Sequence, residues 1–395
     1  MFEQIITERD VRQLIHKHEL INEKENRKLS KDDDVIKNIF FNIDSGKYKF
    51  KITQTSVEDK TLYSADNIET RIILRYLDRL IKRVYKVRQT NRDRIIKQLI
   101  SMLHSNNEFY ICKLDISSFY ETINTTKLLQ HIKDDGIISF KNYSLINSVI
   151  KKKTCKKGLP RGISFSAALS EFYLRSFDKY LKRHSKITYF ARYVDDIIII
   201  SSVDISQEIK DYIRTNLGLE INIEKEKEYK IDNSNNKIFE INFLGYTFLI
   251  HNQKANTRIV EVKIETSKIE KIKKRIIKSS LIFIKDGKFN NYYDRIRLLF
   301  SNYMLDKNKN GILMSGIYYN YRYITDYSSL NKLNQFKNSL ISNNSRLSKK
   351  INSKLSLDQK QKLFKINIYD GFHKKMKVKL TSKRITDLFK DLKYV

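Results

Sequence analysis

Residues 188–202, TYFARYVDDIIIISS, place two runs of β-forming residues on either side of a short polar tip, and this pattern constrains the fold more than any other in the chain. Because Ile, Val, Tyr and Phe dominate both runs, the pattern predicts a hairpin of two buried strands. The tip carries the adjacent carboxylates Asp195 and Asp196. An acidic side chain beside buried strands is costly unless a cation or a partner compensates it, so the tip predicts a functional site.

A third carboxylate, Asp115, ends another predicted strand, FYICKLD at 109–115. Two or three converging carboxylates form the ligand set for a pair of Mg²⁺ ions, roughly 3.5–4 Å apart, that activates a 3′-hydroxyl and stabilises a leaving pyrophosphate. Other acidic runs, at 32–34 and 134–135, lie in polar surroundings that are typical of solvated surface. The apolar context therefore singles out Asp115, Asp195 and Asp196.

The charge balance points to the class of partner. The 77 Lys and Arg residues exceed the 45 Asp and Glu residues by 32. Such a surplus usually marks a polyanionic partner, and nucleic acid is the first candidate. Codon bias in an AT-rich genome is an alternative cause, but it would enrich Asp and Glu codons as well. With 41% apolar residues the chain can bury more than one minimal core, so we expect one or two coupled domains.

Cysteine usage and hydropathy exclude several classes. Cys112 and Cys155 cannot form a disulfide framework, and neither lies beside His or Cys at metal-ligand spacing, so we expect no zinc site. The first ten residues show no basic segment followed by an apolar one, and the longest strongly apolar run, 197–200, is too short to cross a bilayer. We therefore expect a soluble, cytoplasmic protein with no membrane partner.

The spacing of apolar residues predicts the remaining elements. Helical spacing occurs over about 67–86, 95–103, 122–132 and 164–181. The alternation of Lys with aromatic and aliphatic residues predicts a strand with one basic face at 47–53, and β-formers predict a strand or hairpin at 239–250. From about residue 264 the pattern is mostly helical, and Ser267 with Glu270 matches a capping box.

Five segments, in family order, resemble the motifs of reverse transcriptases. YVDD at 193–196 resembles the Y-x-D-D box, and LDISSFYETI at 114–123 resembles motif A. GLPRGISFSAALSEFYL at 158–174 resembles motif B, although Arg stands where the family usually has Gln. LGLEINIEKEK at 217–227 resembles motif D, and FLGY at 243–246 resembles the primer grip.

The resemblance implies an α+β fold of the right-hand polymerase type, with fingers, a palm of antiparallel sheet and helices, and an α-helical thumb. It places an N-terminal region and the fingers at 1–104, the palm with motifs A to E at 105–250, and a helical thumb and C-terminal region at 251–395. It implies an RNA-directed DNA polymerase that copies an RNA template into a DNA product from deoxynucleoside triphosphates.

The resemblance also assigns the metal ligands. Asp115 and Asp195 would be the principal ligands, Asp196 an outer or occasional one, and Ile116 a further one. The cofactor would be two Mg²⁺ ions, with Mn²⁺ as an alternative. Carboxylates that cluster without a metal repel one another, so the intact set argues against a palm that has lost catalysis.

Contacts with the incoming nucleotide follow from the same motifs. Tyr120 lies where the family keeps an aromatic that crowds the sugar 2′ position, although an ordinary core aromatic would fit as well. Gly158 and Gly162 would let the backbone approach the template base and the nucleotide closely. Arg161 would bring a cation near the triphosphate or template. Lys225 matches the motif D lysine that helps to protonate pyrophosphate, and a solvated face is the alternative.

The FLGY segment would hold the primer end through Phe243, Leu244, Gly245 and Tyr246. The alternative interpretation is that these residues form the core of a plain hairpin. The fingers signature R-x-I-x-x-P is absent, so the residues that bind the triphosphate are not identified by a motif. The candidates are basic residues upstream of motif A: Lys49, Lys51, Arg92 and Arg94.

Two C-terminal patterns suit nucleic acid. The helix from Ser267 places basic residues on its polar side, as a thumb helix along a duplex would: Lys268, Lys271, Lys274, Arg275 and Lys278. Tyrosines interleave with Arg322 at 316–327, where they could stack on unpaired bases. A solvated helix face and core packing are the respective alternatives.

DISSFYETI and SEFYL resemble the abortive-infection and defence-associated reverse transcriptases of bacteria, whereas retron and diversity-generating signatures are absent. This resemblance implies antiphage immunity through DNA synthesis on a dedicated non-coding RNA, with a homo-oligomer or a second protein subunit as further partners. Two alternatives stay open: an RNA-dependent RNA polymerase, which more often shows G-D-D, and a non-catalytic basic RNA-binding protein on a retired palm.

Overall fold

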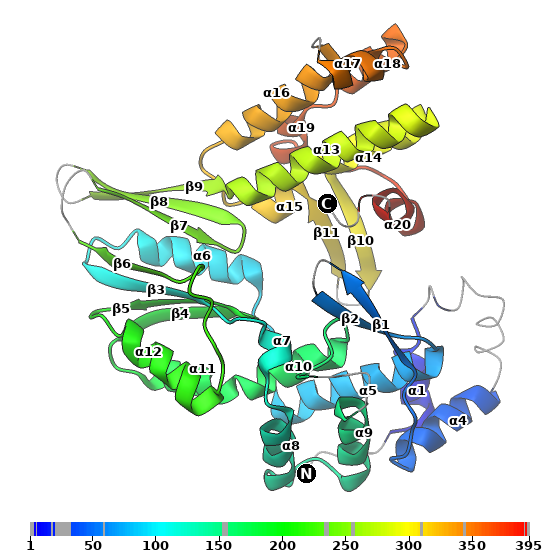
Figure 1. Cartoon of the computed structure of the whole chain (residues 1–395), viewed down its shortest axis with the longest axis vertical. Helices are drawn as coiled ribbons and strands as arrows, with labels where there is room; N and C mark the ends of the chain where they lie inside the picture. Colours follow the sequence, from blue (N-terminus) through cyan, green and yellow to red (C-terminus); the bar gives the residue numbers. More distant parts are fainter. Residues whose placement is uncertain are drawn as a thin grey trace. The chain divides into compact units, whose positions relative to one another are not determined.

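The computed structural model describes residues 4, 6–16, 19, 33–57, 60–151, 157–232, 237–253, 257–308, 311–342, 345–390 and 392. The fold is mixed α+β, as predicted, with antiparallel sheets and many helices (Figure 1). The chain forms two compact units: residues 1–95 with 108–232, and residues 96–107 with 233–395. The division into fingers, palm and thumb at 104 and 250 stays a prediction.

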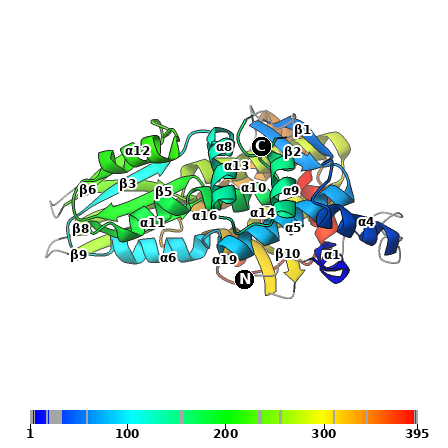
Figure 2. The ribbon, with the colours of Figure 1, turned by 90° about the horizontal axis from the view of Figure 1, so that it is seen from below.

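The first unit contains a four-stranded antiparallel sheet in the order β4-β5-β3-β6. The strands are β3 (Phe109–Asp115), β4 (Ile187–Tyr193), β5 (Asp196–Ser201) and β6 (Lys227–Ile231). The hairpin predicted at 188–202 is confirmed as β4 and β5, and Ile197 to Ile200 are buried. Helices α11 (Arg175–Arg183) and α12 (Ser206–Tyr212) lie against the sheet (Figure 1, Figure 2).

A helical layer completes the first unit. Its elements are α1 (Glu8–Leu14), α4 (Asp33–Asp44), α5 (Ile68–Tyr85), α7 (Phe119–Thr122), α8 (Thr125–Asp134), α9 (Phe140–Ile150), α10 (Ser164–Tyr173) and the π-helix η1 (Ile213–Leu217). The helix predicted at 67–86 is confirmed, and the side chain of Asn67 caps it by accepting from the N–H of Thr70. The helix predicted at 164–181 breaks near Leu174 into α10 and α11.

The strand predicted at 47–53 is wrong in its position. The hairpin of β1 (Ile52–Val57) and β2 (Lys60–Ala65) begins at Ile52, near the end of the predicted strand. Residues 47–51 lie outside any strand. The alternation itself is preserved, because Phe50 and Ile52 are buried whereas Lys49 and Lys51 are exposed. The basic face therefore belongs to a segment between α4 and β1.

Helix α6 (Arg92–Leu103) passes from the first unit into the second. The second unit continues with a three-stranded antiparallel sheet of β7 (Ile238–Phe243), β8 (Tyr246–Gln253) and β9 (Thr257–Ile264). Its helices are α13 (Thr266–Asp286), α14 (Phe289–Phe300), α15 (Ile317–Tyr321), α16 (Ser328–Ser342), α17 (Arg346–Asn352), α18 (Leu357–Phe364), α19 (Ile368–Phe372) and α20 (Ser382–Lys390).

Two details of this unit differ from the sequence-based expectation. The hairpin β10 (Asn302–Asn308) and β11 (Gly311–Gly316) interrupts the helical region. The capping box at Ser267 and Glu270 is absent because α13 already begins at Thr266, with Glu265 as its N-cap and no side-chain cap. Ser267 instead donates to the Glu265 carboxylate, and Glu270 pairs with Lys273. In the described part of the chain, no helix is long and apolar enough to span a bilayer.

Candidate active site

The tip of the β4–β5 hairpin is a two-residue turn. Tyr193 and Asp196 form the last register pair, so Val194 and Asp195 make the connection. Val194 adopts φ 62°, and Asp195 does not share the positive φ. A positive φ at the first turn position matches the right-handed twist of a hairpin, but glycine usually supplies it. A β-branched residue there is strained, at a cost of about 1–3 kcal/mol.

This turn brings three carboxylates to one end of the sheet. Asp115 of β3 and Asp196 of β5 are directly opposite each other in the antiparallel register. Opposite residues of an antiparallel pair project from the same face, with roughly 4.5–5.5 Å between their Cβ atoms. The N–H of Ile116 donates to the carbonyl of Asp195 at 3.3 Å, which ties the turn to the end of β3. The convergence expected from the sequence is therefore present.

A lysine supplies a counter-charge at this site. Lys225 Nζ donates to Oδ1 and Oδ2 of Asp115 at 3.1 and 3.0 Å. The Asp115 side chain is only 9% exposed, whereas the Lys225 side chain is 58% exposed. The turn that carries Lys225 is held in place because the N–H of Asn222 donates to the carbonyl of Asp115 at 2.8 Å. Lys225 thus lies beside Asp115 with an exposed side chain, and its role in protonating pyrophosphate stays a prediction.

Two of the carboxylates are electrostatically strained. Burial, together with the charges of Asp195 and Asp115, raises the pKa of Asp196 to about 6. Burial also raises the pKa of Asp195, and the charge of Asp115 adds to the effect. Burial lowers the pKa of Lys225, but its hydrogen bonds to Asp115 and the charge of that residue outweigh this, so the pKa is raised overall. The site has more negative charge than its lysine balances.

The donor set fits a divalent cation, although the described residues contain no group of three or more His, Cys, Asp or Glu side chains already arranged as a metal centre. Carboxylate oxygens are the ligands that Mg²⁺ prefers. The ammonium of Lys225 on both oxygens of Asp115 marks a place where a cation is favoured. Asp115, Asp195 and Asp196 are the residues that would hold the metal; the assignment of Ile116 stays a prediction.

A buried arginine that the sequence reasoning missed supports the turn. Arg192 is 7% exposed and donates to Asp178 on α11 at 2.8 and 2.7 Å and to Glu171 on α10 at 3.2 and 2.7 Å. Its Nη1 also donates to the carbonyl of Val194 at 3.2 Å. An arginine inside an apolar β run was the available signal, because such a charge needs buried partners. Arg192 thereby holds the strained residue of the turn.

The expected nucleotide contacts lie beside the aspartates but are differently engaged. Arg161 binds Glu121 through Nε and Nη2 at 2.9 and 3.0 Å, and its guanidinium lies 5.1 Å from the centre of the Tyr120 ring. Tyr120 is partly buried, and its pKa is raised by burial. The cation expected at the triphosphate or template is therefore paired with a carboxylate of the protein, and Glu121 was not anticipated.

The two motif B glycines are needed for close backbone approach. Gly158 has φ +62°, and a Cβ there would lie 2.0 Å from the carbonyl oxygen of Tyr120. Gly162 has φ +98°, and a Cβ there would lie 2.8 Å from the carbonyl oxygen of Tyr63. The approach that the structure shows is to the protein backbone of α7 and β2. Contacts of these glycines with template and nucleotide stay predictions.

The FLGY segment forms the turn between β7 and β8 in the second unit. Leu244 and Gly245 have φ 48° and 82°, while Phe243 and Tyr246 are fully buried. The Tyr246 hydroxyl donates to the carbonyl of Asn320 at 3.0 Å. Two of the four predicted primer-grip residues are thus core side chains of the hairpin, and the primer contact stays a prediction for the turn itself.

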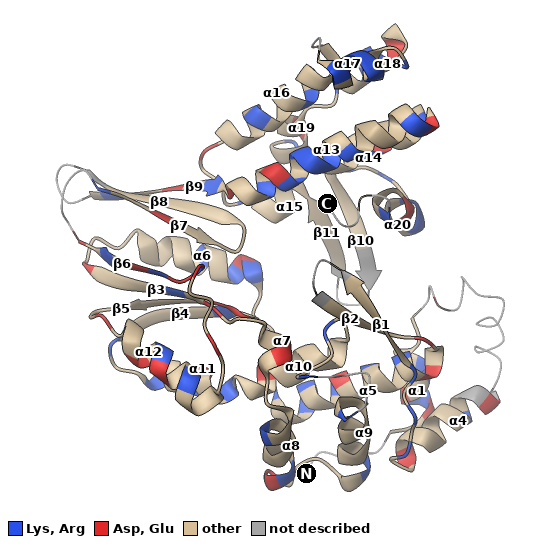
Figure 3. Ribbon diagram, viewed as in Figure 1, with Lys and Arg blue, Asp and Glu red and all other residues tan. Residues whose placement is uncertain are grey.

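The remaining basic candidates lie elsewhere. Lys49 and Lys51 line an open cavity whose lining residues include none of the three aspartates, and Arg92 is the first residue of α6. On α13, the side chains of Lys268, Lys271 and Lys274 are exposed. Figure 3 shows Lys and Arg positions along this helix. The guanidinium of Arg322 lies 5.7 and 5.5 Å from the ring centres of Tyr318 and Tyr319, so part of the tyrosine cluster stacks internally.

Cys112 is buried and free, and Cys155 lies outside the described residues.

Comparisons with solved structures give distant similarity. Apo telomerase from Candida tropicalis has 13% identity and a TM-score of 0.40, over 88% of this chain and 65% of that chain. The same telomerase truncated from its C-terminal domain has 17% identity and a TM-score of 0.38, over 55% of each chain. Telomerase from Candida albicans in complex with a TWJ fragment of telomeric RNA has 12% identity and a TM-score of 0.37, over 86% of this chain and 62% of that chain. The chain thus spans less than two thirds of these chains' lengths.

No curated protein matched the chain. The family model described as reverse transcriptase (RNA-dependent DNA polymerase) matches residues 44–248, more than half of the 395 residues. The matched range includes the three aspartates, Lys225 and the motif B segment. The chain belongs to the reverse transcriptase family.

Proposed function

We propose that the chain copies an RNA template into DNA, joining deoxynucleoside triphosphates to a 3′-hydroxyl at Asp115, Asp195 and Asp196. The observation that carries this proposal is the register of β3 and β5, which sets Asp115 opposite Asp196 with Asp195 in the adjoining turn. Membership of the reverse transcriptase family supports the same reaction class.

Two Mg²⁺ ions, when bound by these carboxylates, would lower the pKa of the attacking hydroxyl and stabilise charge on the leaving pyrophosphate. Side chains of the protein would supply the proton for the leaving group, select the sugar and position the carboxylates. The ammonium of Lys225, which lies at Asp115, can donate a proton from Nζ to the departing pyrophosphate. Tyr120 bounds the sugar and disfavours a 2′-hydroxyl. Arg192 and the register pair of Tyr193 and Asp196 hold the carboxylates in position.

The proposed reaction is tested with the protein purified together with its bound RNA. Labelled deoxynucleotides and Mg²⁺ are added, beside the same preparation treated with RNase. The proposal expects incorporation that RNase pretreatment abolishes, and sequencing of the product then identifies the template. Incorporation that survives RNase, or that uses ribonucleotides in preference, contradicts an RNA-templated DNA polymerase.

We further propose that this synthesis serves antiphage defence in the bacterial cytoplasm, on a dedicated non-coding RNA. The motif A and motif B segments, DISSFYETI and SEFYL, support this through their resemblance to defence-associated reverse transcriptases. Phage plaques are counted on a bacterial host that expresses the wild-type chain with its flanking non-coding region, or the Asp195→Asn variant. Fewer plaques with the wild type alone supports the proposal; equal plating across a broad phage panel contradicts it.

A further inference from the structure

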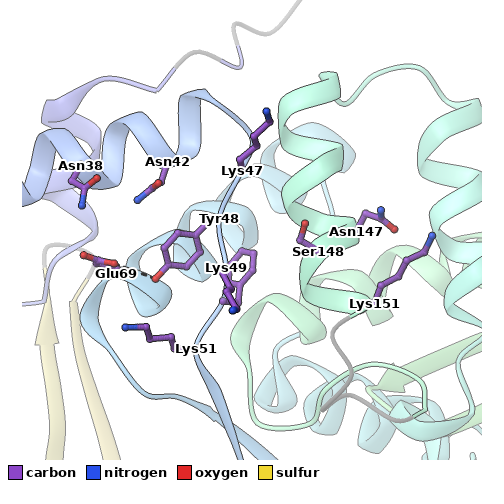
Figure 4. A pocket seen from close by; sticks show the side chains of 11 residues that line it. Asn38, Asn42, Lys47, Tyr48, Lys49, Lys51, Glu69, Asn147, Ser148 and Lys151 are labelled. Atoms are coloured by element: carbon purple, nitrogen blue, oxygen red, sulfur yellow. Dashed lines mark hydrogen bonds between the residues drawn. The ribbon is translucent and has the colours of Figure 1, made fainter.

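An open cavity of about 1030 Å³ lies in the first unit, and none of the residues of the aspartate site line it. Its walls are helix α4, the segment 47–51, the start of α5 and helix α9 with Lys151 after it (Figure 4). The volume is at the upper end of the roughly 300–1,000 Å³ range of small-ligand pockets. The cavity is therefore larger than a single phosphate or sugar requires, and it is open to an extended ligand.

The side chains that line this cavity carry a net positive charge. Four lysines line it, Lys47, Lys49, Lys51 and Lys151, against one carboxylate, that of Glu69. In the part of the chain that the structure describes, none of these ammonium groups forms an ion pair. Nearby Lys141, by contrast, binds Asp44 at 2.8 Å. Several positive charges around one opening favour the binding of an anion that carries several negative charges.

The cavity also offers groups that contact bases. The Tyr48 ring stands in its middle, with its hydroxyl donating to Glu69 at 3.3 Å (Figure 4). The ring of Phe50 packs edge-on against it, with 5.0 Å between centroids, so the orientation of Tyr48 is fixed. Residues with amide side chains line the cavity on both sides, Asn42 on α4 and Asn147 on α9. Among the described residues, the buried Oδ1 of Asn147 has no hydrogen-bond partner.

We propose that this cavity binds single-stranded nucleic acid: the lysines contact backbone phosphates, a base stacks on Tyr48, and the amides contact base edges or sugar. Proteins that bind single strands combine a basic groove with aromatic platforms in this way. The proposal gives Lys49 and Lys51 a role apart from the incoming nucleotide. It goes beyond the proposed polymerase activity, because the cavity shares no residue with the aspartate site and its binding needs no synthesis.

The test is fluorescence anisotropy of labelled single strands of about twelve nucleotides, oligouridine RNA and oligodeoxythymidine, in EDTA and without nucleotides. The triple variant Lys49→Ala, Lys51→Ala, Lys151→Ala is compared with a control that loses the same charge, Lys127→Ala, Lys133→Ala, Lys182→Ala. The cavity variant is expected to bind at least about tenfold more weakly at roughly 0.1 M salt. Because each phosphate contact on a single strand contributes about 0.7 to the salt slope, the slope should fall by about 2.

A second measurement locates the contact independently of affinity. Oligouridine that contains 4-thiouridine is crosslinked to the wild-type protein, and the crosslinked peptides are identified by mass spectrometry. Crosslinks within residues 47–51 support the proposal. Absence of crosslinks there, or equal binding by the cavity and control variants, overturns it. Weakening for the RNA strand alone identifies the ligand as RNA, weakening for the DNA strand alone identifies it as DNA, and weakening for both identifies the shared backbone.

Discussion

Lys225 donates from Nζ to both carboxylate oxygens of Asp115, at 3.1 and 3.0 Å, so a cation of the protein already occupies the proposed metal position. The lysine side chain is more than half exposed, so it can leave without losing packing, whereas Asp115 is fixed in β3. Lys225 and a divalent cation therefore compete for the same oxygens.

Replacement of Lys225 by methionine should tighten divalent-cation binding. Removing one positive charge beside three carboxylates favours another cation, and screening at an exposed side chain limits the gain to roughly two- to fivefold. Isothermal titration with Mg²⁺, or electron paramagnetic resonance with Mn²⁺, measures it. Lys227→Met, on the exposed face of β6, is the matched control and should leave the affinity unchanged. Weaker binding by Lys225→Met would show that the lysine is not a competitor.

Asp196 should make the metal-free protein less stable at neutral pH. Its pKa in the folded state is about 6, above the usual value near 4, so the folded protein takes up a proton before the unfolded chain does as the pH falls. The destabilisation is therefore present above pH 6 and is relieved between about pH 6 and 4. Asp196→Asn should raise the unfolding free energy by about 1–2 kcal/mol at pH 7.5 in EDTA.

Denaturant titrations at several pH values measure this effect. The advantage of Asp196→Asn should shrink as the pH falls from 6 to 4, while Asp135→Asn at the exposed end of α8 should show none. A difference that is constant across this pH range contradicts the assignment of the strain to the Asp196 carboxylate.

Arg192→Lys should impair the turn while keeping its charge. Lysine cannot reproduce the five hydrogen bonds that the guanidinium makes to Asp178, Glu171 and the carbonyl of Val194. We expect a loss of about 2 kcal/mol in stability and a fall in kcat with little change in the KM for nucleotide, because the carboxylates lose their positioning. Thermal melting and steady-state extension measure the two effects. A rise in KM with kcat unchanged would show that Arg192 acts on nucleotide binding instead. Arg183→Lys, on the exposed end of α11, is the control and should change neither stability nor kcat.

Tyr120→Val should admit ribonucleotides. If the Tyr120 ring bounds the sugar, its removal opens space for the 2′-hydroxyl, and discrimination should fall by roughly 10- to 200-fold. The ratio of kcat/KM for a deoxynucleotide and the matching ribonucleotide measures this. Tyr120→Phe keeps the ring and should keep the ratio. Unchanged discrimination in Tyr120→Val would identify the ring as a packing residue over which Arg161 stacks.

The parts of the site that the sequence predicts are those that local patterns determine. The β4–β5 hairpin follows from two apolar runs around a polar tip, and the position of Asp115 follows from the end of an apolar strand. Antiparallel pairing then brings the three carboxylates together without further information. Lys225, 110 positions from Asp115, came from the family motif and not from any local pattern.

The parts that escaped prediction depend on distant partners. Arg161 is paired with Glu121, 40 positions away, and no local pattern distinguishes that pairing from contact with a triphosphate. Arg192 joins residues from two helices and a turn. The β10–β11 hairpin lies in a stretch whose Asn and Lys residues have weak preferences, so pairing of the two strands decides the structure there.

Asp115, Asp195 and Asp196 are the proposed catalytic carboxylates, with Asp115 and Asp195 as the principal metal ligands. Extension of a 5′-labelled DNA primer annealed to an RNA template, with Mg²⁺, compares the wild type with Asp115→Asn, Asp195→Asn and the surface control Asp135→Asn. We expect each active-site variant to lose more than about 10³-fold in rate while it remains folded, and Asp135→Asn to extend the primer at the wild-type rate. Extension by Asp115→Asn or Asp195→Asn at the wild-type rate would contradict this assignment.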